Sequence, residues 1–581
     1  MAVRERYLFG SWMPDRAWHW SNEEGLQDIW NLLPIAGGSY RSTPALGGIS
    51  GASSGLKYTS ALYYAHTGAF ATEGLYQLGE TAAGDFPSGS RFIQRLPPPS
   101  PAGGGASFVD VTPATLVAAP GGGVKQQWAS FTCYGDKVVW ADGFNPVRVY
   151  NGAGVFTDMI TSPATDKPNG YFVTVVGSHV MLGFCTNPAD VLGGIKLWWS
   201  ARNDETEWTP GNGRAGFLYL RTADMGAITG LVGFPEYCIV FLHRGIIRLD
   251  RVSGATVFDQ VVIGGPAEGT HESSSIVRYG DEIYYRSNTG FRRLVDGSRP
   301  ELIGVGAVHR HLAYEQSWNE QYRMSPAPPY AGECHCVGAV DESWGTIVWM
   351  LGFRTFEQPD EIWDYRELIG YHVAEDRWTR LPALRQNRLS AIASMPQLRG
   401  ASNPLVPLDG LVSWSPLLEG LRCTRDIYSA TVPTVETAGE RGLVTRPISF
   451  GQPRRLLGIR PIYRYLSLNA GFGAVTPSTS VYGVQSQPAA EGEPPEVAVA
   501  SSLDPITRTW ELTDPAANIF PAATSAVDST GWIRAGLPLD GDNFVFRVTV
   551  PPFSTAEATS DFLADLVGLE LEFEAPVRSS R

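Results

Sequence analysis

A strand, turn, strand unit recurs along this chain and constrains its fold more than any other sequence feature. Residues 137–140 form an apolar β-rich run, Ala141 to Gly143 is a turn, and 146–150 returns as a second run. The same order recurs at 58–78, 237–249, 282–294 and 370–381. Short β-rich runs joined by Gly-bearing or charged turns are typical of β-hairpins, so an all-β fold is predicted.

The units return at intervals of roughly 40 to 65 residues, about the length of a four-stranded propeller blade. The 64 glycines and 42 prolines favour many short strands joined by turns, and the 25 phenylalanines, 23 tyrosines and 17 tryptophans supply bulk for packing between sheets. No fixed dipeptide is shared by all units. The pattern therefore predicts an irregular β-propeller of roughly five or six blades, by division of length alone.

Three regions follow from shifts in this pattern. Residues 1–50 are broken by Pro and Gly and are predicted to form an extended N-terminal arm, whose Trp rings must be buried against the rest of the chain or against a neighbouring subunit. Residues 51–445 are assigned to the propeller, with a Pro/Gly-rich loop at 97–123. Residues 446–581 alternate apolar and polar positions, as in 544–550 and 566–574, and are predicted to form a C-terminal β-sandwich.

The charge balance limits the possible partners. The formal net charge is -14, and the longest basic runs are the pairs Arg292-Arg293 and Arg454-Arg455. Tight, sequence-specific nucleic-acid binding requires clustered Lys and Arg, so it is disfavoured. An acidic wall around DNA would instead repel the phosphates and let the polymer slide.

A search for chemistry finds only weak candidates. The acidic groups are Asp204, Glu205 and Glu207; Asp360, Glu361 and Asp364; and Glu375 with Asp376. Paired acids serve glycoside hydrolysis when they face each other across a cleft, but these groups lie at turn-like positions and are expected to be solvated turn acids.

Two further segments contain residue types that can bind a metal ion. Cys334-His335-Cys336 lacks a second pair at zinc spacing, with His309 and His311 as its only possible recruits. The segment 540–543 could hold a cation in a loop but is expected to be a turn between strands. Nucleophile-elbow, P-loop and zinc-protease motifs are absent from the sequence. We therefore expect no enzyme activity, no catalytic residue, no metal and no cofactor.

Neither a signal peptide nor an apolar run of membrane-spanning length is found in the sequence. We expect synthesis in a cytoplasm and no stable membrane anchoring.

Taken in order, these segments resemble the tail nozzle, or tail tubular protein B, family of short-tailed bacteriophages. The family's opening pattern matches Trp12-Met13-Pro14-Asp15, then Gly25 to Pro34, then Tyr40 to Pro44. Its Leu-Trp element resembles 197–204 followed by Trp208. The similarity spans most of the chain in short pieces.

The resemblance implies a virion tail protein that forms a homohexameric ring below a twelve-subunit adaptor, or connector, ring. It implies contact with tail fibres or spikes, and non-specific passage of double-stranded DNA through the ring. The arm would lock neighbours or dock the adaptor, so deleting residues 1–44 is expected to leave a folded monomer that no longer enters tails.

One alternative comes from a different class. A glycan-binding or glycan-cleaving propeller would use exposed rings such as Trp198, Trp199 and Trp378 to stack on sugars. Propeller tryptophans more often pack between blades.

Overall fold

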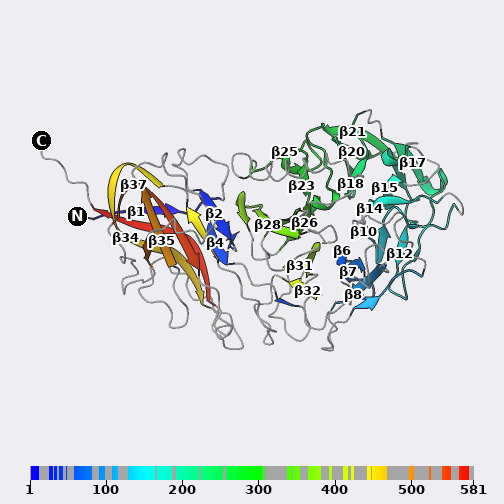
Figure 1. Cartoon of the computed structure of the whole chain (residues 1–581). Helices are drawn as coiled ribbons and strands as arrows, with labels where there is room; N and C mark the ends of the chain where they lie inside the picture. Colours follow the sequence, from blue (N-terminus) through cyan, green and yellow to red (C-terminus); the bar gives the residue numbers. More distant parts are fainter. Residues whose placement is uncertain are drawn as a thin grey trace, which may run out of the picture.

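The computed structural model is built almost entirely from β-strands, arranged as a propeller and an adjoining large sheet (Figure 1). The structure describes residues 2–11, 25–30, 32–35, 38–42, 47–48, 58–80, 91–98, 108–114, 129–163, 167–185, 192–220, 224–252, 257–304, 308, 336–342, 345–353, 364–380, 391–395, 410–415, 420–423, 441–445, 448–467, 496–502, 522–524, 539–550 and 562–574. Over these residues the predicted all-β fold is confirmed.

Seven four-stranded antiparallel sheets form the blades within the described residues. The first three blades contain β6 (Tyr58–Ala65), β7 (Gly74–Glu80), β8 (Arg91–Leu96) and β9 (Val109–Asp110); β10 (Ser130–Tyr134), β11 (Lys137–Ala141), β12 (Arg148–Tyr150) and β13 (Thr157–Asp158); and β14 (Gly170–Val176), β15 (His179–Cys185), β16 (Lys196–Trp199) and β17 (Gly216–Tyr219). The next three contain β18 (Ile228–Gly233), β19 (Tyr237–Leu242), β20 (Gly245–Arg251) and β21 (Phe258–Gly264); β22 (Val277–Tyr279), β23 (Glu282–Ser287), β24 (Gly290–Val295) and β25 (Glu301–Leu302); and β26 (Cys336–Asp341), β27 (Thr346–Phe353), β28 (Asp364–His372) and β29 (Arg377–Arg380).

The seventh blade joins distant parts of the chain. It contains β30 (Ala391–Met395), β31 (Gly410–Ser415), β32 (Gly420–Cys423) and, as its outer strand, β5 (Gly47–Gly48). The expectation of five or six blades was therefore wrong. Four blades lie between residues 130 and 302, so the number of residues per blade is smaller there than the average used for the prediction. The seventh blade also takes its outer strand from the N-terminal part of the chain.

The second part of the fold is one hydrogen-bonded network of ten described strands. It contains β1 (Ala2–Leu8), β2 (Leu26–Trp30), β3 (Leu32–Ile35), β4 (Ser39–Ser42), β33 (Arg441–Thr445), β34 (Ile448–Ser467), β35 (Glu496–Ser502), β36 (Ala522–Thr524), β37 (Leu539–Val550) and β38 (Phe562–Glu574). The long strand β34 pairs with β37 over its first part and with β38 over the rest. Strands that change partner in this way turn the corners of packed sheets.

The N-terminal residues are extended, and their partner is the same chain. β1 pairs with β38, β2 pairs with β33, and β4 pairs with β38. The described residues of this segment thus pair within the chain, whereas the burial of its Trp rings stays a prediction, because none of those side chains lies in the part of the chain that the structure describes. The Trp12 to Asp15 motif lies outside the described residues.

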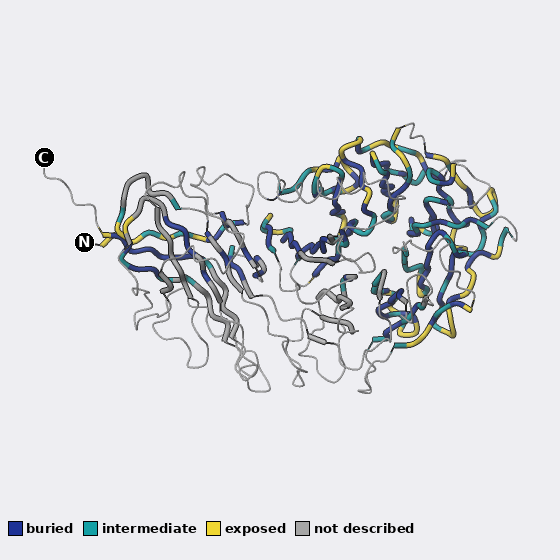
Figure 2. Tube along the Cα trace, in the orientation of Figure 1, coloured by how far each residue is buried: buried dark blue, intermediate teal, exposed yellow. Residues whose placement is uncertain are grey.

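Both parts share one hydrophobic core. A single cluster of buried side chains includes Leu26 and Leu32 from the N-terminal strands, Phe546 from β37, and Trp349 and Trp378 from the sixth blade. Figure 2 shows buried segments in the strands of the large sheet as well as in the blades. Because the core is continuous, the propeller and the sheet are expected to move as one body.

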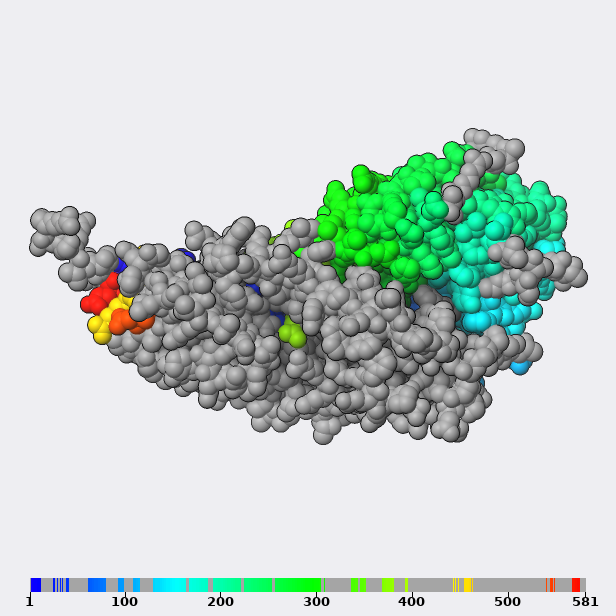
Figure 3. Space-filling model, turned by 45° about the horizontal axis from the view of Figure 1, so that its top comes forward, coloured from blue at the N-terminus to red at the C-terminus, as the bar shows by residue number. Residues whose placement is uncertain are grey.

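The described residues between 130 and 302 gather at one end of the molecule, drawn in cyan to green away from the red atoms of β38 (Figure 3). Within the described residues, no helix is long and apolar enough to cross a membrane.

Glycines allow the inner strands of neighbouring blades to approach closely. A Cβ on Gly233, in the inner strand β18, would overlap the carbonyl oxygen of Val175 in β14. A Cβ on Gly338, in β26, would overlap the Val277 side chain in β22. Glycine is often found inside a strand where another backbone approaches closely, because it has no Cβ to clash.

We expect Gly233→Ala to lower the free energy of unfolding by about 3 kcal/mol, because the backbone of β14 cannot yield without disturbing its own blade. Gly194→Ala is the matched control, since its nearest contact would be an ordinary 3.4 Å from the Ala227 Cβ. Chemical denaturation of both variants measures the difference, and equal midpoints would contradict the close approach.

Candidate functional site

The acidic groups singled out from the sequence are occupied by local contacts. Asp204 accepts hydrogen bonds from the Thr206 hydroxyl (2.7 Å) and amide (2.9 Å), and these bonds lower the pKa of its carboxyl. Glu205 is buried and forms an ion pair with Lys137. Glu207 accepts the Thr209 amide at 2.6 Å, which lowers its pKa. Asp204 and Glu207 thus fix a turn, as expected for acids at turn-like positions, whereas the expectation of a solvated acid was wrong for the buried Glu205.

The structure also places Asp376 and Asp364, two of the remaining acidic candidates. Asp376 lies in the turn between β28 and β29 and accepts the Tyr371 hydroxyl at 2.9 Å. Asp364 begins β28, whereas Asp360 and Glu361 lie outside the described residues.

The two segments considered as metal sites, 334–336 and 540–543, are described to different extents by the structure. Cys336 is fully buried in β26, and Cys334, His335, His309 and His311 lie outside the described residues. Residues 540–543 are part of strand β37, paired with β34, so the expected turn there was wrong. Among the described residues no three His, Cys, Asp or Glu side chains gather in a way that could hold a metal ion.

The three tryptophans proposed to stack on sugars are mostly enclosed. Trp378 is 1% exposed and Trp199 is 6% exposed, with its indole N–H donating to the Arg214 carbonyl at 2.8 Å. Trp198 is half-buried, and the Lys196 ammonium lies 4.9 Å from its ring centroid. Trp199 and Trp378 therefore serve packing and are not available to a ligand.

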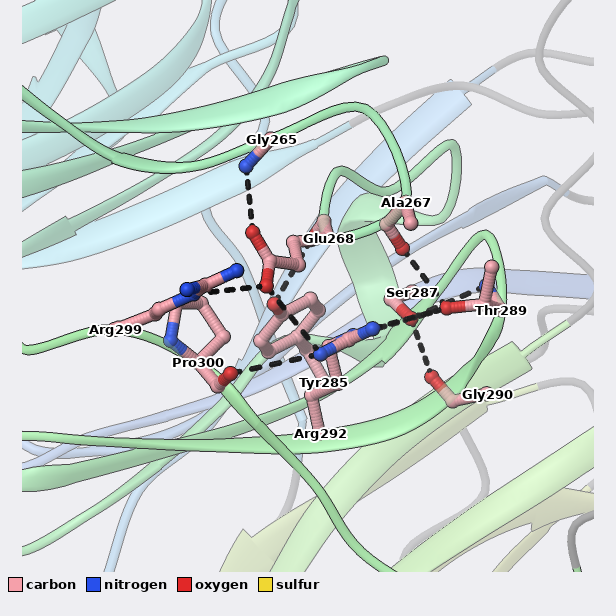
Figure 4. Close-up of polar contacts among 10 residues, drawn as sticks. All are labelled: Gly265, Ala267, Glu268, Tyr285, Ser287, Thr289, Gly290, Arg292, Arg299 and Pro300. Atoms are coloured by element: carbon pink, nitrogen blue, oxygen red, sulfur yellow. Dashed lines mark hydrogen bonds and ion pairs between the residues drawn. The ribbon is translucent and has the colours of Figure 1, made fainter.

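An ionic network around the buried carboxylate of Glu268 joins the fourth and fifth blades (Figure 4). Glu268, in the connection from β21 to β22, accepts the Gly265 amide at 2.6 Å on Oε2. Its Oε1 lies 3.7 Å from Nη1 of Arg292 and 3.5 Å from Nε of Arg299. The Tyr285 hydroxyl donates to the Glu268 carbonyl at 2.8 Å.

The same network fixes the hairpin between β23 and β24. Arg292 donates from Nε to Ser287 Oγ and from Nη2 to Thr289 Oγ1, both at 3.1 Å (Figure 4). Thr289 in turn donates to the Ala267 carbonyl at 3.0 Å. A buried carboxylate with two guanidinium partners and a backbone donor is electrostatically satisfied, so we assign this cluster to holding the interblade connection in place. The sequence signal was the Arg292-Arg293 pair, which was read only as a basic run.

A second set of contacts missed by sequence reasoning joins the propeller to the large sheet. In β29, the Trp378 amide donates to Ser11 Oγ at 3.1 Å, and Thr379 Oγ1 donates to the Leu32 carbonyl. Arg377 Nη1 donates to the carbonyls of Gly38 (2.9 Å) and Phe9 (3.3 Å). Three consecutive residues of the sixth blade, 377–379, thus bind the N-terminal segment. Nothing in the sequence around them predicted these contacts.

The propeller axis is enclosed by its inner strands. Ser130 Oγ of β10 donates to the Val173 carbonyl of β14 at 3.2 Å and accepts the Val173 amide at 3.1 Å. The Gly233 amide of β18 donates to Thr174 Oγ1 of β14 at 2.9 Å. Contacts of this kind hold the neighbouring inner strands β10, β14 and β18 close together around the propeller axis.

His179 gives the propeller a predicted pH dependence. It is 2% exposed, its Nδ1–H donates to the Ser200 carbonyl at 2.8 Å, and burial lowers its pKa below the ordinary value of 6.5. The unfolded chain therefore binds the proton more readily, and stability that is present above pH 6.5 is lost as the pH falls.

We expect His179→Gln, which keeps a donor for Ser200, to lose less stability than the wild type between pH 7 and pH 5. Denaturant unfolding at each pH measures this, and parallel pH profiles for the two proteins would refute it.

Comparison with known proteins gives no family assignment. No family model matches the chain, and no curated protein matches it. Among solved structures, the WD40 domain of Pan2 from Neurospora crassa is similar at 10% identity and a TM-score of 0.34, over 63% of this chain and 88% of that one. U3-55K is similar at 9% identity and a TM-score of 0.33, over 62% of this chain and 88% of that one.

A catalytically inactive virginiamycin B lyase from Staphylococcus aureus, with quinupristin, is similar at 9% identity and a TM-score of 0.34, over 67% of this chain and 96% of that one. The propeller fold itself follows from the strand order of this chain's seven blades.

Proposed function

We propose that this chain is a structural subunit of a short phage tail, forming a six-membered nozzle ring through which DNA leaves, with no enzymatic chemistry of its own. The observation that carries the proposal is the core shared by the propeller and the large sheet, in which Phe9, Leu26 and Leu32 pack with Trp349 and Trp378. A ring that guides a polymer under pressure needs subunits that do not flex between domains.

The sequence resemblance also supports this role. The segment resembling the family's opening pattern includes Leu26 and Tyr40, which are buried in the shared core. The Leu-Trp element resembling the family ends at Trp208, which is fully buried and donates its indole N–H to the Glu205 carbonyl at 2.7 Å. Leu26, Tyr40 and Trp208, which belong to the resembling segments, are thus buried in the fold.

The route of the DNA follows from the enclosed propeller axis. The Ser130 side chain of β10 hydrogen-bonds to the Val173 backbone of β14, and from inner strands this close we infer that the axis of one propeller is too narrow for a double helix. DNA would therefore pass between subunits, along a wall to which each copy contributes one face. The net charge of -14 would keep phosphates from adhering to that wall.

The proposal is tested by counting copies of the chain in purified virions. Quantitative peptide mass spectrometry should find half as many copies of this chain as of a twelve-subunit portal. Native mass spectrometry of the purified chain bound to its adaptor should give the same sixfold stoichiometry. Absence from particles, or a monomer that binds polysaccharide in solution, would overturn the proposal.

A further inference from the structure

β1 is a largely exposed strand at an edge of the large sheet, as the structure describes it. Within the described residues its one strand neighbour is β38. Five of its seven residues are exposed, including the apolar Val3 (40%) and Leu8 (43%). A long exposed edge strand is a template for pairing with another strand, unless its side chains prevent it.

The backbone direction of β1 shows which residues face outward. The Phe9 amide, one residue beyond the strand, donates to the Val567 carbonyl at 3.0 Å. Because N–H and C=O groups alternate sides along a strand, odd-numbered residues of β1 face β38. The main-chain groups of Arg6 and Leu8 therefore point away from the sheet.

The side chains on one face of the sheet form rows of alternating charge. Arg460 of β34 lies opposite Glu570 of β38, which lies opposite Arg6 of β1. Glu570 forms ion pairs with Arg460 and with Arg6, whose Nε is 3.8 Å from Oε1. The side chain of Glu570 is 9% exposed, whereas that of Arg6 is 72% exposed. The row thus ends on an exposed positive charge.

The next row along the strand ends in the same way. Arg4 Nε lies 3.2 Å from Oε1 of Glu572, and the side chain of Arg4 is 54% exposed against 8% for Glu572. Opposite charges directly across from each other stabilise a strand pair, and like charges destabilise it. A strand added beside β1 would therefore be stabilised by acidic residues two positions apart, opposite Arg4 and Arg6.

A second copy of β1 does not meet this requirement. Side chains that face each other across two strands lie on the same face, so Arg4 and Arg6 can oppose only even-numbered residues of another β1 in a two-fold antiparallel pair. In the fully overlapped register Arg4 opposes Arg6, and shifting by two residues places Arg4 opposite Arg4, or Arg6 opposite Arg6. Two-fold self-pairing is disfavoured by this repulsion.

We propose that the outer edge of β1 binds an extended acidic segment of a different protein, which adds to the large sheet as an antiparallel strand. Main-chain hydrogen bonds to the groups of Arg6 and Leu8 would supply affinity, and acidic side chains opposite Arg4 and Arg6 would supply specificity. This inference does not depend on the role in a phage tail.

The test uses the full chain and two labelled peptides that differ only in charge sign. The acidic peptide is acetylated and amidated Thr-Glu-Val-Glu-Val-Thr, and the basic peptide has Lys in both Glu positions. Fluorescence anisotropy should show saturable binding of the acidic peptide that weakens as salt is added, and no binding of the basic one. Hydrogen exchange should slow at the Arg6 and Leu8 amides when the acidic peptide is bound.

Charge-reversal variants distinguish binding at the edge of β1 from non-specific electrostatic attraction between the peptide and the protein. Arg6→Glu should weaken binding of the acidic peptide on the order of tenfold and strengthen binding of the basic one. Arg202→Glu makes the same charge change at an exposed position of the propeller and should leave both affinities unchanged. Equal effects of the two variants, or equal binding of both peptides, would overturn the proposal. So would self-association of the chain that Arg6→Glu abolishes.

Discussion

Deletion of residues 1–48 is expected to abolish folding of the whole chain. The deletion removes β1 to β4 from the large sheet and β5 from the seventh blade. It also removes Leu26, Ile29, Leu32 and Tyr40, each 0% exposed in the shared core. Losing a single buried side chain of this size costs about 2 to 5 kcal/mol, and a typical domain is stable by only about 5 to 15 kcal/mol.

This result would differ from the sequence-based expectation of a folded monomer that only fails to assemble. Circular dichroism and thermal unfolding of the truncated chain provide the measurement. Adding residues 1–48 as a separate peptide is the control, and it should restore a cooperative transition if the strands pair as described. A soluble truncated chain with the thermal transition of the full protein would show that the segment is an appendage.

Replacement of Trp378 by alanine is expected to destabilise the protein by about 3 to 5 kcal/mol. The Trp378 ring lies 4.9 Å from the Tyr371 ring and 5.7 Å from Phe291, measured between centroids, and 6.0 Å from Trp349. These rings form the part of the core where the sixth blade meets the N-terminal strands. The cavity would therefore weaken the junction between propeller and sheet, and limited proteolysis should cut between them.

Two variants control for general effects of removing an indole. Trp198→Ala removes a half-buried ring away from the junction and should cost less. Trp378→Phe keeps an aromatic ring and removes an indole N–H that is buried without a hydrogen-bond partner in the described structure, so it too should cost less than alanine. If the proteolysis pattern of Trp378→Ala matched that of Trp198→Ala, Trp378 would have no special role at the junction.

Local sequence was sufficient to locate one hairpin in each of five blades. The turns at Ala141 to Gly143, at 243–245 and at 287–290 separate β11 from β12, β19 from β20 and β23 from β24, as predicted. The hairpin of the third blade was not identified, although its signal was present: two apolar runs flank Gly177 and Ser178, and they form β14 and β15. Turn preference and alternation act over a few residues, which is why they are readable without a structure.

Among the candidate site residues, local sequence predicted turns correctly but did not predict burial or long-range pairing. The sequence indicated correctly that Asp204 and its neighbours belong to a turn, because short polar side chains bind nearby backbone amides. It could not tell that Trp378 is buried, because the Phe291 and Trp349 rings packed around it come from strands of the fifth and sixth blades that are distant in sequence. It also misread 540–543, where pairing with β34 overrides a composition that favours a turn.

The sequence by itself determined that this protein is built of short strands, that many of them form hairpins, and that neither catalytic motifs nor basic clusters are prominent. The tertiary structure decided which distant strands pair. Ala2 opposite Glu574, and Gly48 opposite Arg422, join the beginning of the chain to its end and to its last blade. Such pairs depend on the summed burial of surfaces from many segments, and no local pattern of residues encodes that sum.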